Sequence, residues 1–182
     1  MRLFIAVEFP ADILAALTEL QREIRAKVER GRFKRSENFH LTLKFLGETP
    51  HEKLNRLIEQ LSGAAKGQQE FSLRLGQVGV FGARSPIRVI WQGLAGDTDR
   101  LYSLQQAVET ACSAIGFASE KRPYSPHITL AQDVTPLPGK PYLPQSLPDL
   151  PFAVREFALV LSEEKDRKRL YTTLHSFSLA QN

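Results

Sequence analysis

The sequence has 182 residues, of which 42% are hydrophobic and 24% are charged, with 11 glycines and 11 prolines. These proportions predict a globular chain with a hydrophobic core of its own, and they exclude a disordered or fibrous protein as a general description. Lysine and arginine total 24 against 20 aspartates and glutamates, a mild positive excess that favours a polyanionic partner without identifying one.

The cysteine content and the lack of long apolar runs indicate the cellular setting. Cys112 is the only cysteine, so the chain forms no internal disulfide and has no set of thiols for structural zinc, which favours a reducing compartment. Residues 1–10 are too short an apolar stretch for a secretory signal, and no apolar run reaches the roughly 18 residues of a membrane-spanning helix. We therefore expect a cytoplasmic protein that neither is exported nor spans a membrane.

In the first half of the chain the hydrophobic pattern predicts two strands and two helices. Residues 2–8 form a short buried strand, and residues 10–30 form an amphipathic helix that begins at a proline. A half-buried strand follows over residues 39–46. Residues 49–65 begin with threonine, proline and a capping-box glutamate, and therefore predict a second helix.

The strand over residues 39–46 alternates between an apolar face and a second face that carries polar groups. The apolar face consists of Phe39, Leu41, Leu43 and Phe45, and the other face of His40, Thr42, Lys44 and Leu46. We expect the apolar face to lie against the core.

In the second half, residues 71–81 and 87–94 predict two strands joined by a turn at residues 82–86. Residues 97–115 predict a long amphipathic helix that ends at a glycine, and residues 127–131 predict another strand.

The last part of the chain begins with the proline-rich residues 134–151, which predict an extended surface loop because proline donates no backbone hydrogen bond. Residues 157–161 and 170–179 predict a hairpin with a charged turn at residues 163–169.

One order of elements occurs twice. A strand, a long helix and a basic loop precede His40 and again precede His127, each of which begins an H-x-T motif. Asp12 precedes His40 by 28 positions and Asp99 precedes His127 by 28 positions, and the two histidines are 87 positions apart. The pattern predicts a duplicated unit folded as two similar lobes, with the motif strands facing each other, and a single bilobal domain over residues 1–182.

The two motifs carry groups suited to phosphodiester hydrolysis. Side chains at positions i and i+2 of a strand share a face roughly 6.6 Å apart, so His40 points with Thr42 and His127 with Thr129. Two imidazoles across one phosphate allow one group to accept a proton while the other donates one, and an ordinary histidine pKa near 6.5 suits both tasks. The threonine hydroxyls are placed to donate to the non-bridging phosphate oxygens.

Basic side chains adjoin both motifs. Lys44 is expected on the face of Thr42, whereas the equivalent position after Thr129 is Ala131, which predicts a chemically asymmetric site. Further basic residues precede the first motif at Arg30, Arg32, Lys34 and Arg35, and the second at Lys121 and Arg122. Such runs are often only solvated loops, but their position next to both motifs favours a polyanionic substrate.

A single H-x-T occurs by chance, but two H-[LI]-T-L motifs at equivalent places in a duplicated pattern do not fit that explanation. A zinc site is the main chemical alternative, because zinc takes histidine ligands. It needs three or four ligands, and neither motif has a second one on its own strand face, so we expect no metal and no cofactor.

Three segments together resemble a known family: RLFIAVEF at residues 2–9, ENFHLTLKFLGE at residues 37–48, and RPYSPHITLA at residues 122–131. The chain resembles the bacterial RNA 2′,3′-cyclic phosphodiesterases, also called 2′-5′ RNA ligase-like proteins, of the two-histidine phosphoesterase superfamily. The resemblance implies an α+β fold of two pseudo-symmetric lobes, each an antiparallel sheet with outer helices, with the active-site groove between them.

The resemblance also implies an activity. RNA ends or oligonucleotides with a 2′,3′-cyclic phosphate would be opened to a 2′-phosphate, and a weaker reverse reaction would join RNA ends through a 2′-5′ linkage. By analogy His40 is the proton donor to the departing O3′, and His127 is the proton acceptor that activates water. We expect a monomer that binds such RNA ends.

The sequence departs from the family at Gln132, where many relatives carry an arginine five positions after the second motif histidine. Lys44, Lys121 or Arg122 is expected to compensate for this lost charge. Tyr124, between two prolines, is a candidate platform for stacking a base, although it equally fits a loop-packing role.

Two other functions stay open. The chain fits a phosphodiesterase that acts on 2′-5′ oligonucleotides or cyclic nucleotides, and it fits a non-catalytic RNA-binding module. Against the binding module, a pure binder has no chemical use for two histidines.

Overall fold

The computed structural model describes residues 1–82, 85–139, 141–143 and 149–181. Its α-helices are α1 (Ala11–Arg25), α2 (Leu54–Lys66) and α3 (Thr98–Ser113). Its strands are β1 (Arg2–Val7), β2 (Val28–Phe33), β3 (Leu41–Glu48), β4 (Phe71–Phe81), β5 (Ile87–Gly96), β6 (Ile128–Pro136), β7 (Pro151–Val154), β8 (Glu156–Lys165) and β9 (Lys168–Ser178).

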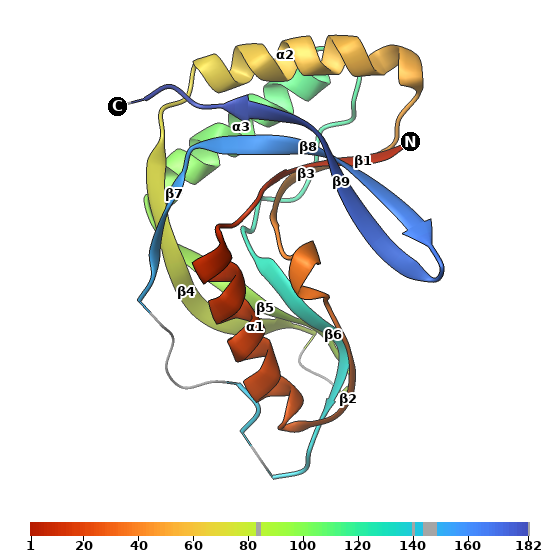
Figure 1. Cartoon of the computed structure of the whole chain (residues 1–182), viewed down its shortest axis with the longest axis vertical. Helices are drawn as coiled ribbons and strands as arrows, with labels where there is room; N and C mark the ends of the chain where they lie inside the picture. The colour runs from red at the N-terminus through yellow and green to blue at the C-terminus, as the bar shows by residue number, and fades with distance from the viewer. Residues whose placement is uncertain (83–84, 140, 144–148, 182) are drawn as a thin grey trace.

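The strands form two antiparallel sheets. Sheet A has the order β3-β1-β8-β9, and sheet B has the order β2-β6-β5-β4-β7. Figure 1 shows sheet A with α2 and α3 in the upper part of the molecule and sheet B with α1 in the lower part. The prediction of an α+β fold built from two antiparallel sheets with outer helices is confirmed.

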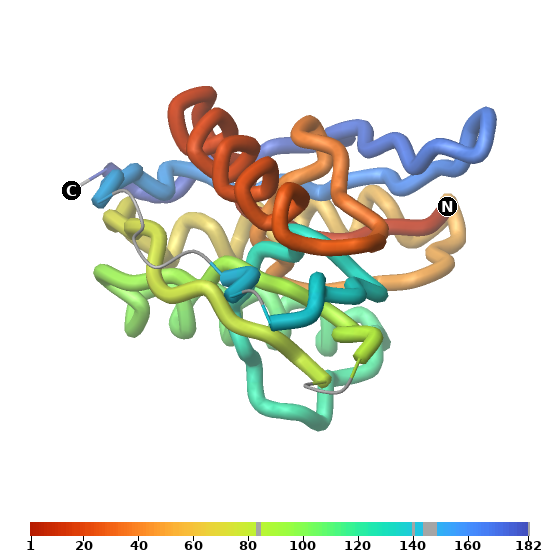
Figure 2. The backbone as a smooth tube through the Cα atoms, turned by 90° about the horizontal axis from the view of Figure 1, so that it is seen from below, coloured from red at the N-terminus to blue at the C-terminus, as the bar shows by residue number. Residues whose placement is uncertain are grey.

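The helices connect the two sheets. Helix α1 follows β1 of sheet A but packs against β2 and β6 of sheet B, whereas α3 follows β5 of sheet B and packs against β3 of sheet A. Figure 2 shows α1 and α3 on opposite sides of the molecule, with strands between them. Each motif strand, β3 or β6, is therefore supported by a helix that comes from the other half of the fold.

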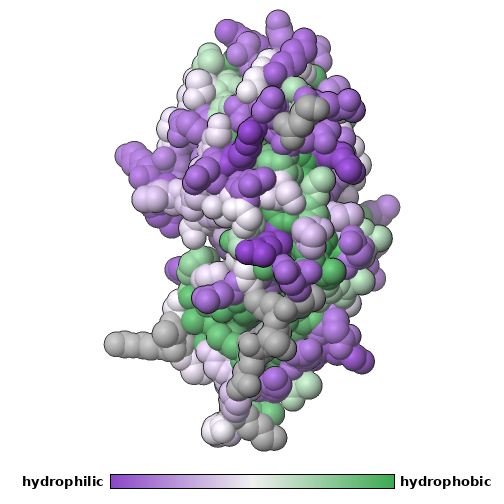
Figure 3. All heavy atoms as spheres, turned by 90° about the vertical axis from the view of Figure 1, so that its left-hand side faces the viewer, coloured by the Kyte–Doolittle hydropathy of each residue, from purple (hydrophilic) through white to green (hydrophobic). Residues whose placement is uncertain are grey.

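One hydrophobic core joins the two halves. The buried face of α1 carries Ile13, Leu17 and Ile24, which belong to the same cluster as residues of both sheets. At the surface seen from the left of Figure 1, hydrophilic side chains cover most of the upper part, and hydrophobic side chains reach the surface in the lower part (Figure 3). The continuous core fixes the two motif strands relative to each other.

The first helix is shorter than predicted. It ends at Arg25 instead of residue 30, and Val28–Phe33 forms β2, which pairs antiparallel with β6. This strand passes close to β6 at Gly31, where an added Cβ would lie 3.0 Å from a methyl group of Val134. Tertiary pairing with β6 outweighs the weak helical pattern of this segment.

The boundaries of three further predicted segments differ in the structure: the last hairpin, the second helix and the proline-rich loop. The hairpin β8–β9 is longer, because its turn is only Asp166 and Arg167, whose φ angles of 51° and 59° fit a tight hairpin turn. Helix α2 begins after a short 3-10 turn, and the Thr49 hydroxyl donates to the carbonyl of Gly47 instead of capping the helix. The predicted loop 134–151 contributes its first residues to β6 and its last to β7, and parts of it lie outside the described residues.

Candidate active site

The two motif histidines stand directly before the two equivalent strands, β3 and β6. His40 Nδ1 lies 2.8 Å from the carbonyl oxygen of Asn38, and His127 Nδ1 lies 2.7 Å from that of Ser125. A carbonyl oxygen only accepts, so in each ring Nδ1 carries the proton and donates it. The neutral ring then leaves Nε2 unprotonated and available for chemistry.

Aromatic side chains support both imidazoles. The rings of Phe4 and Tyr171 lie 4.7 Å and 5.2 Å from the ring of His40, centroid to centroid, and Phe81 lies 5.1 Å from His127 at nearly a right angle. Sheet A therefore supports the first histidine and sheet B the second, in similar ways.

The surroundings of the two histidines are linked by one electrostatic interaction and one hydrogen bond. His127 is the smallest of the causes that lower the pKa of His40, after burial and Lys34. The loop before His127 also reaches across to sheet A, because the Tyr124 hydroxyl donates to the backbone carbonyl of Thr42 over 2.9 Å.

The pKa of His40 is lowered to about 4. Burial of the ring is the largest cause, and the positive charge of Lys34 is the second, while the hydrogen bond to Asn38 acts in the opposite direction. The unliganded site therefore holds His40 as a neutral imidazole at pH 7.

The two threonines lie on the faces that carry the histidines. Thr42 pairs with Ala6, which packs with Phe4 beside His40. Thr129 pairs with Trp91, which packs against Phe81 beside His127. Among the described residues, neither hydroxyl has an assigned hydrogen-bond partner, so both remain able to donate to a ligand.

A β-bulge follows each motif. In β3, Thr42 pairs with Ala6 and Lys44 with Ile5, so Leu43 is the extra residue. In β6, Thr129 pairs with Trp91 and Ala131 with Ile90, so Leu130 is the extra residue. Because of the bulges, Lys44 in β3 and Ala131 in β6 face the core. The residues that follow them, Phe45 and Gln132, lie on the same faces as the threonines.

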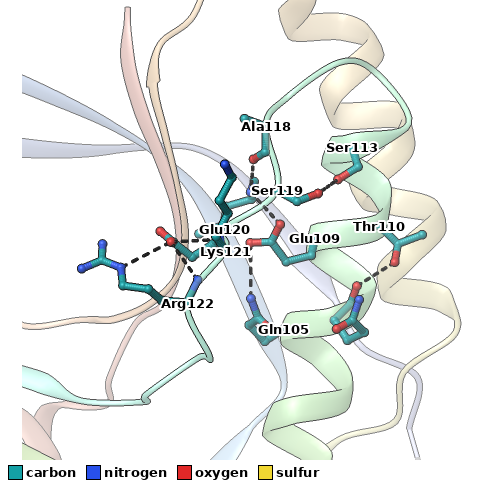
Figure 4. A network of polar contacts seen from close by, with 11 residues as sticks. Gln105, Glu109, Thr110, Ser113, Ala118, Ser119, Glu120, Lys121 and Arg122 are labelled. Carbon is teal, nitrogen blue, oxygen red and sulfur yellow. Dashed lines mark hydrogen bonds and ion pairs between the residues drawn. The ribbon is translucent and has the colours of Figure 1, made fainter.

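The prediction that Lys44 shares the face of Thr42 is wrong, because the bulge turns Lys44 inward. Its side chain is 4% exposed, and its ammonium donates to Glu109 on α3 over 2.7 Å and to the carbonyl of Ala118 over 2.9 Å. Figure 4 shows Glu109 pointing from α3 towards the loop that holds Ala118. Lys44 stabilises the packing of α3 on β3 instead of contacting a substrate.

Phe45 faces solvent for the same reason. The alternation predicts it in the core, but after the bulge it pairs with Phe4 on the outer face and is 73% exposed. The equivalent position of β6 is Gln132, which lies on the same face of sheet B as Thr129.

The structure does not bring Arg122 or Tyr124 into the site as predicted. The Arg122 side chain is 87% exposed and pairs with Glu120 (Figure 4). The ring of Tyr124 packs against Tyr102, its hydroxyl is engaged with Thr42, and burial raises its pKa. Tyr124 connects the loop before β6 to β3. Lys121, the other predicted compensating cation, is exposed on the same loop.

Two features of the site were missed from the sequence. Lys34 is the member of the first basic cluster whose charge acts on His40, and the composition of the cluster does not distinguish it from its neighbours. A hollow of about 170 Å³ is lined by residues that include Phe45, Arg2 and Arg169, and also Phe4 and Tyr171, whose rings contact His40. Phe45 lines the hollow because of the bulge after Thr42, and the alternation of apolar and polar residues in the sequence does not predict that bulge.

Two further observations apply to the described residues alone. No three histidine, cysteine, aspartate or glutamate side chains gather there as a metal site would require. No helix among them is both long enough and apolar enough to cross a bilayer.

Known proteins share the sequence and the fold. The LigT-like phosphoesterase family matches residues 7–91 and 94–170. An RNA 2′,3′-cyclic phosphodiesterase of Geobacillus stearothermophilus is 33% identical over 97% of the chain, which spans only 56% of that protein. An RNA 2′,3′-cyclic phosphodiesterase of Thermus thermophilus is 36% identical over 98% of the chain and 90% of that protein.

A solved structure agrees with these sequence matches. The crystal structure of Escherichia coli LigT complexed with 3′-AMP is 31% identical, has a TM-score of 0.82, and is covered over 98% of its length by 99% of this chain. The resemblance seen in the three sequence segments is thereby confirmed, and the chain belongs to the LigT-like phosphoesterase family.

Proposed function

We propose that this chain hydrolyses the 2′,3′-cyclic phosphate end of RNA to a 2′-phosphate, without a metal ion. The observation that carries the proposal is the matched pair of imidazoles, each with Nδ1 donating to a carbonyl two residues earlier and each therefore presenting a free Nε2. The printed names of the relatives, RNA 2′,3′-cyclic phosphodiesterase, supply the substrate class.

The proposed reaction uses one proton transfer on each side of phosphorus. Water attacks phosphorus as His127 takes its proton, the bond from phosphorus to O3′ breaks, and His40 gives its proton to O3′. The products are a 2′-phosphate and a free 3′-hydroxyl. Thr42 and Thr129 donate to the non-bridging oxygens, where negative charge accumulates in the transition state.

His40 has to gain a proton before it can serve as the acid. Its pKa of about 4 leaves it neutral at pH 7 in the unliganded site. An anionic phosphate beside the ring raises the pKa of a histidine, because a nearby opposite charge favours the protonated form. Binding of the substrate thus supplies the condition under which His40 acts as donor.

The hollow lined by Phe4 and Tyr171, the two rings that contact His40, supports a nucleotide substrate over a small phosphodiester. A large, 73% exposed aromatic side chain, Phe45, stands next to two arginines, a combination suited to a base and a phosphate of the same chain. If a 5′-hydroxyl attacks phosphorus in place of water, the same site would join two RNA ends through a 2′-5′ linkage.

The proposal is tested with a purified chain and a short RNA that ends in a 2′,3′-cyclic phosphate, incubated with EDTA. We expect a product with phosphate on the 2′-hydroxyl alone, identified by its resistance to an enzyme that removes only 3′-phosphates. A 3′-phosphate product, or activity that EDTA abolishes and zinc restores, would contradict the mechanism. Faster cleavage of 2′-5′ oligonucleotides in the same assay would favour that substrate class instead.

A further inference from the structure

Lys34 occupies a fixed position at the boundary of the two sheets. It follows β2, its backbone N–H donates to the carbonyl of Leu130 over 3.1 Å, and its own carbonyl accepts from Gln21 of α1 over 2.7 Å. The partly buried side chain reaches the other sheet, where its ammonium lies 3.3 Å from the Tyr171 hydroxyl on β9. The position of this cation is therefore set by β6, α1 and β9 together.

Among the other basic residues that adjoin the two motifs, Arg30 and Lys121 are exposed, and the rest are neutralised by carboxylates. Four of them form ion pairs: Arg32 with Asp133, Arg35 with Glu37, Lys44 with Glu109, and Arg122 with Glu120. Within the described part of the chain, Lys34 has no carboxylate partner. A partly buried cation without a counter-ion is only partly compensated by a phenol, so an arriving anion would stabilise it strongly.

Lys34 also lies next to the reacting groups. Tyr171 contacts both residues, because its hydroxyl accepts from Lys34 and its ring lies 5.2 Å from the ring of His40. After burial, the positive charge of Lys34 is the second largest cause of the lowered pKa of His40. An anion held by Lys34 would thus lie beside His40.

We infer that Lys34 binds a non-bridging oxygen of the phosphate held between His40 and His127, and that Tyr171 positions its ammonium. The inference rests on the proposed function and names the cation of that site. The cations predicted from the sequence lie elsewhere: Lys44 faces the core, and Lys121 and Arg122 face solvent.

This arrangement couples phosphate binding to the protonation of His40. In the unliganded site the charge of Lys34 opposes a proton on His40. The negative charge of a bound phosphate offsets the positive charge of Lys34 at His40, which raises the pKa of His40. His40, the proton donor, therefore becomes protonated when the substrate binds.

The experiment follows the ring signals of His40 by NMR through a pH titration, with and without inorganic phosphate. We compare the wild type with Lys34→Gln, Lys34→Arg and the control Arg32→Gln, whose arginine lies two positions away on the same segment and pairs with Asp133. In the free protein, Lys34→Gln raises the pKa of His40, because it removes a positive charge, whereas Lys34→Arg and Arg32→Gln leave it near the wild-type value.

Phosphate binding supplies the second readout. We expect Lys34→Gln to weaken the affinity for inorganic phosphate about 10- to 100-fold, as loss of a charge-assisted hydrogen bond does, and Lys34→Arg to retain most of it. Wild-type phosphate affinity in a folded Lys34→Gln protein would overturn the inference, and so would an unchanged pKa of His40.

The same variants separate this inference from the proposed function, because neither readout requires turnover. If the wild type binds phosphate through Lys34 but leaves RNA cyclic phosphates intact, the proposed reaction fails and the anion site stands. If Lys34→Gln hydrolyses RNA ends with the wild-type KM, the inference about Lys34 fails and the proposed reaction stands.

Discussion

His40 and His127 are held by the same backbone arrangement but stand in different surroundings. Each ring donates to the carbonyl two residues earlier and precedes a strand with a bulge at the fourth motif position. Around His40, burial and Lys34 lower the pKa to about 4, whereas the hydrogen bond of His127 is exposed to solvent. The repeated backbone fixes the geometry of the pair, and the neighbouring side chains make the two members chemically different.

The residues that follow the bulge also differ between β3 and β6. At the inward position β3 has Lys44 and β6 has Ala131, and at the outward position β3 has Phe45 and β6 has Gln132. The first strand thus carries an extra buried ion pair and an extra exposed aromatic ring. Substitutions that make one strand resemble the other test what each difference contributes.

The largest expected effect follows removal of either imidazole. His40→Ala and His127→Ala should each lower the rate of cyclic phosphate hydrolysis by about 10²- to 10⁴-fold, because each removes one proton-transfer partner. Single-turnover rates and a thermal unfolding curve for each variant check this. A folded variant with a near-normal rate would show that its histidine takes no part in proton transfer.

Lys44→Ala places at β3 the residue that β6 has at the equivalent position. It leaves the carboxylate of Glu109, whose side chain is only 13% exposed, without its partner, so we expect a loss of about 3–5 kcal/mol in the free energy of unfolding. Urea denaturation measures this value. Arg122→Ala, which breaks an exposed pair, should cost at most about 1 kcal/mol.

Two outcomes bear on the position of Lys44. The double variant Lys44→Ala/Glu109→Ala should recover part of the lost stability, because no unpaired charge remains. A Lys44→Ala protein that stays stable but loses phosphate affinity would contradict the inward position and restore Lys44 to the site.

The lowered pKa of His40 predicts a dependence of stability on pH. Between its ordinary value of 6.5 and about 4, the unfolded chain binds a proton at His40 that the native protein does not. The free energy of unfolding should therefore fall as the pH is lowered through this window, by about 3 kcal/mol from this group. In His40→Gln this contribution should vanish, and identical pH profiles for the two proteins would refute it.

Phe45→Gln places at β3 the residue that β6 has at the other equivalent position. Because Phe45 is mostly exposed, stability should change little, while the KM for an RNA end should rise by an amount corresponding to the loss of roughly 1–3 kcal/mol of base stacking. Kinetics with a cyclic-phosphate RNA measure this, and inorganic phosphate affinity serves as the control that should not change. An unchanged KM would remove Phe45 from substrate binding.

Much of this arrangement follows from the sequence. Hydrophobic periodicity predicts β1, β4, β5 and the three helices, and the repeated H-x-T motifs predict equivalent positions for His40 and His127, each directly before its strand in the structure. These features depend on local pattern, and so the sequence is sufficient for them.

Other features depend on contacts between distant segments. The bulges at Leu43 and Leu130 arise from pairing with β1 and β5, so strict alternation assigned Lys44 and Phe45 to the wrong faces. Strand β2 exists because β6 offers it an edge. Lys34 differs from Arg32 and Arg35 in having no ion pair with any described residue and in donating to Tyr171 on the other sheet. Such differences are visible only once the chain has folded.

The central claim is that two imidazoles act as a pair across one phosphorus atom. It is tested most directly by comparing single-turnover hydrolysis of a cyclic-phosphate RNA by His40→Ala, His127→Ala and the double variant. We predict that the double variant is scarcely slower than either single variant, because groups that act as a unit give non-additive losses. Losses that multiply, each histidine contributing independently of the other, would contradict the account.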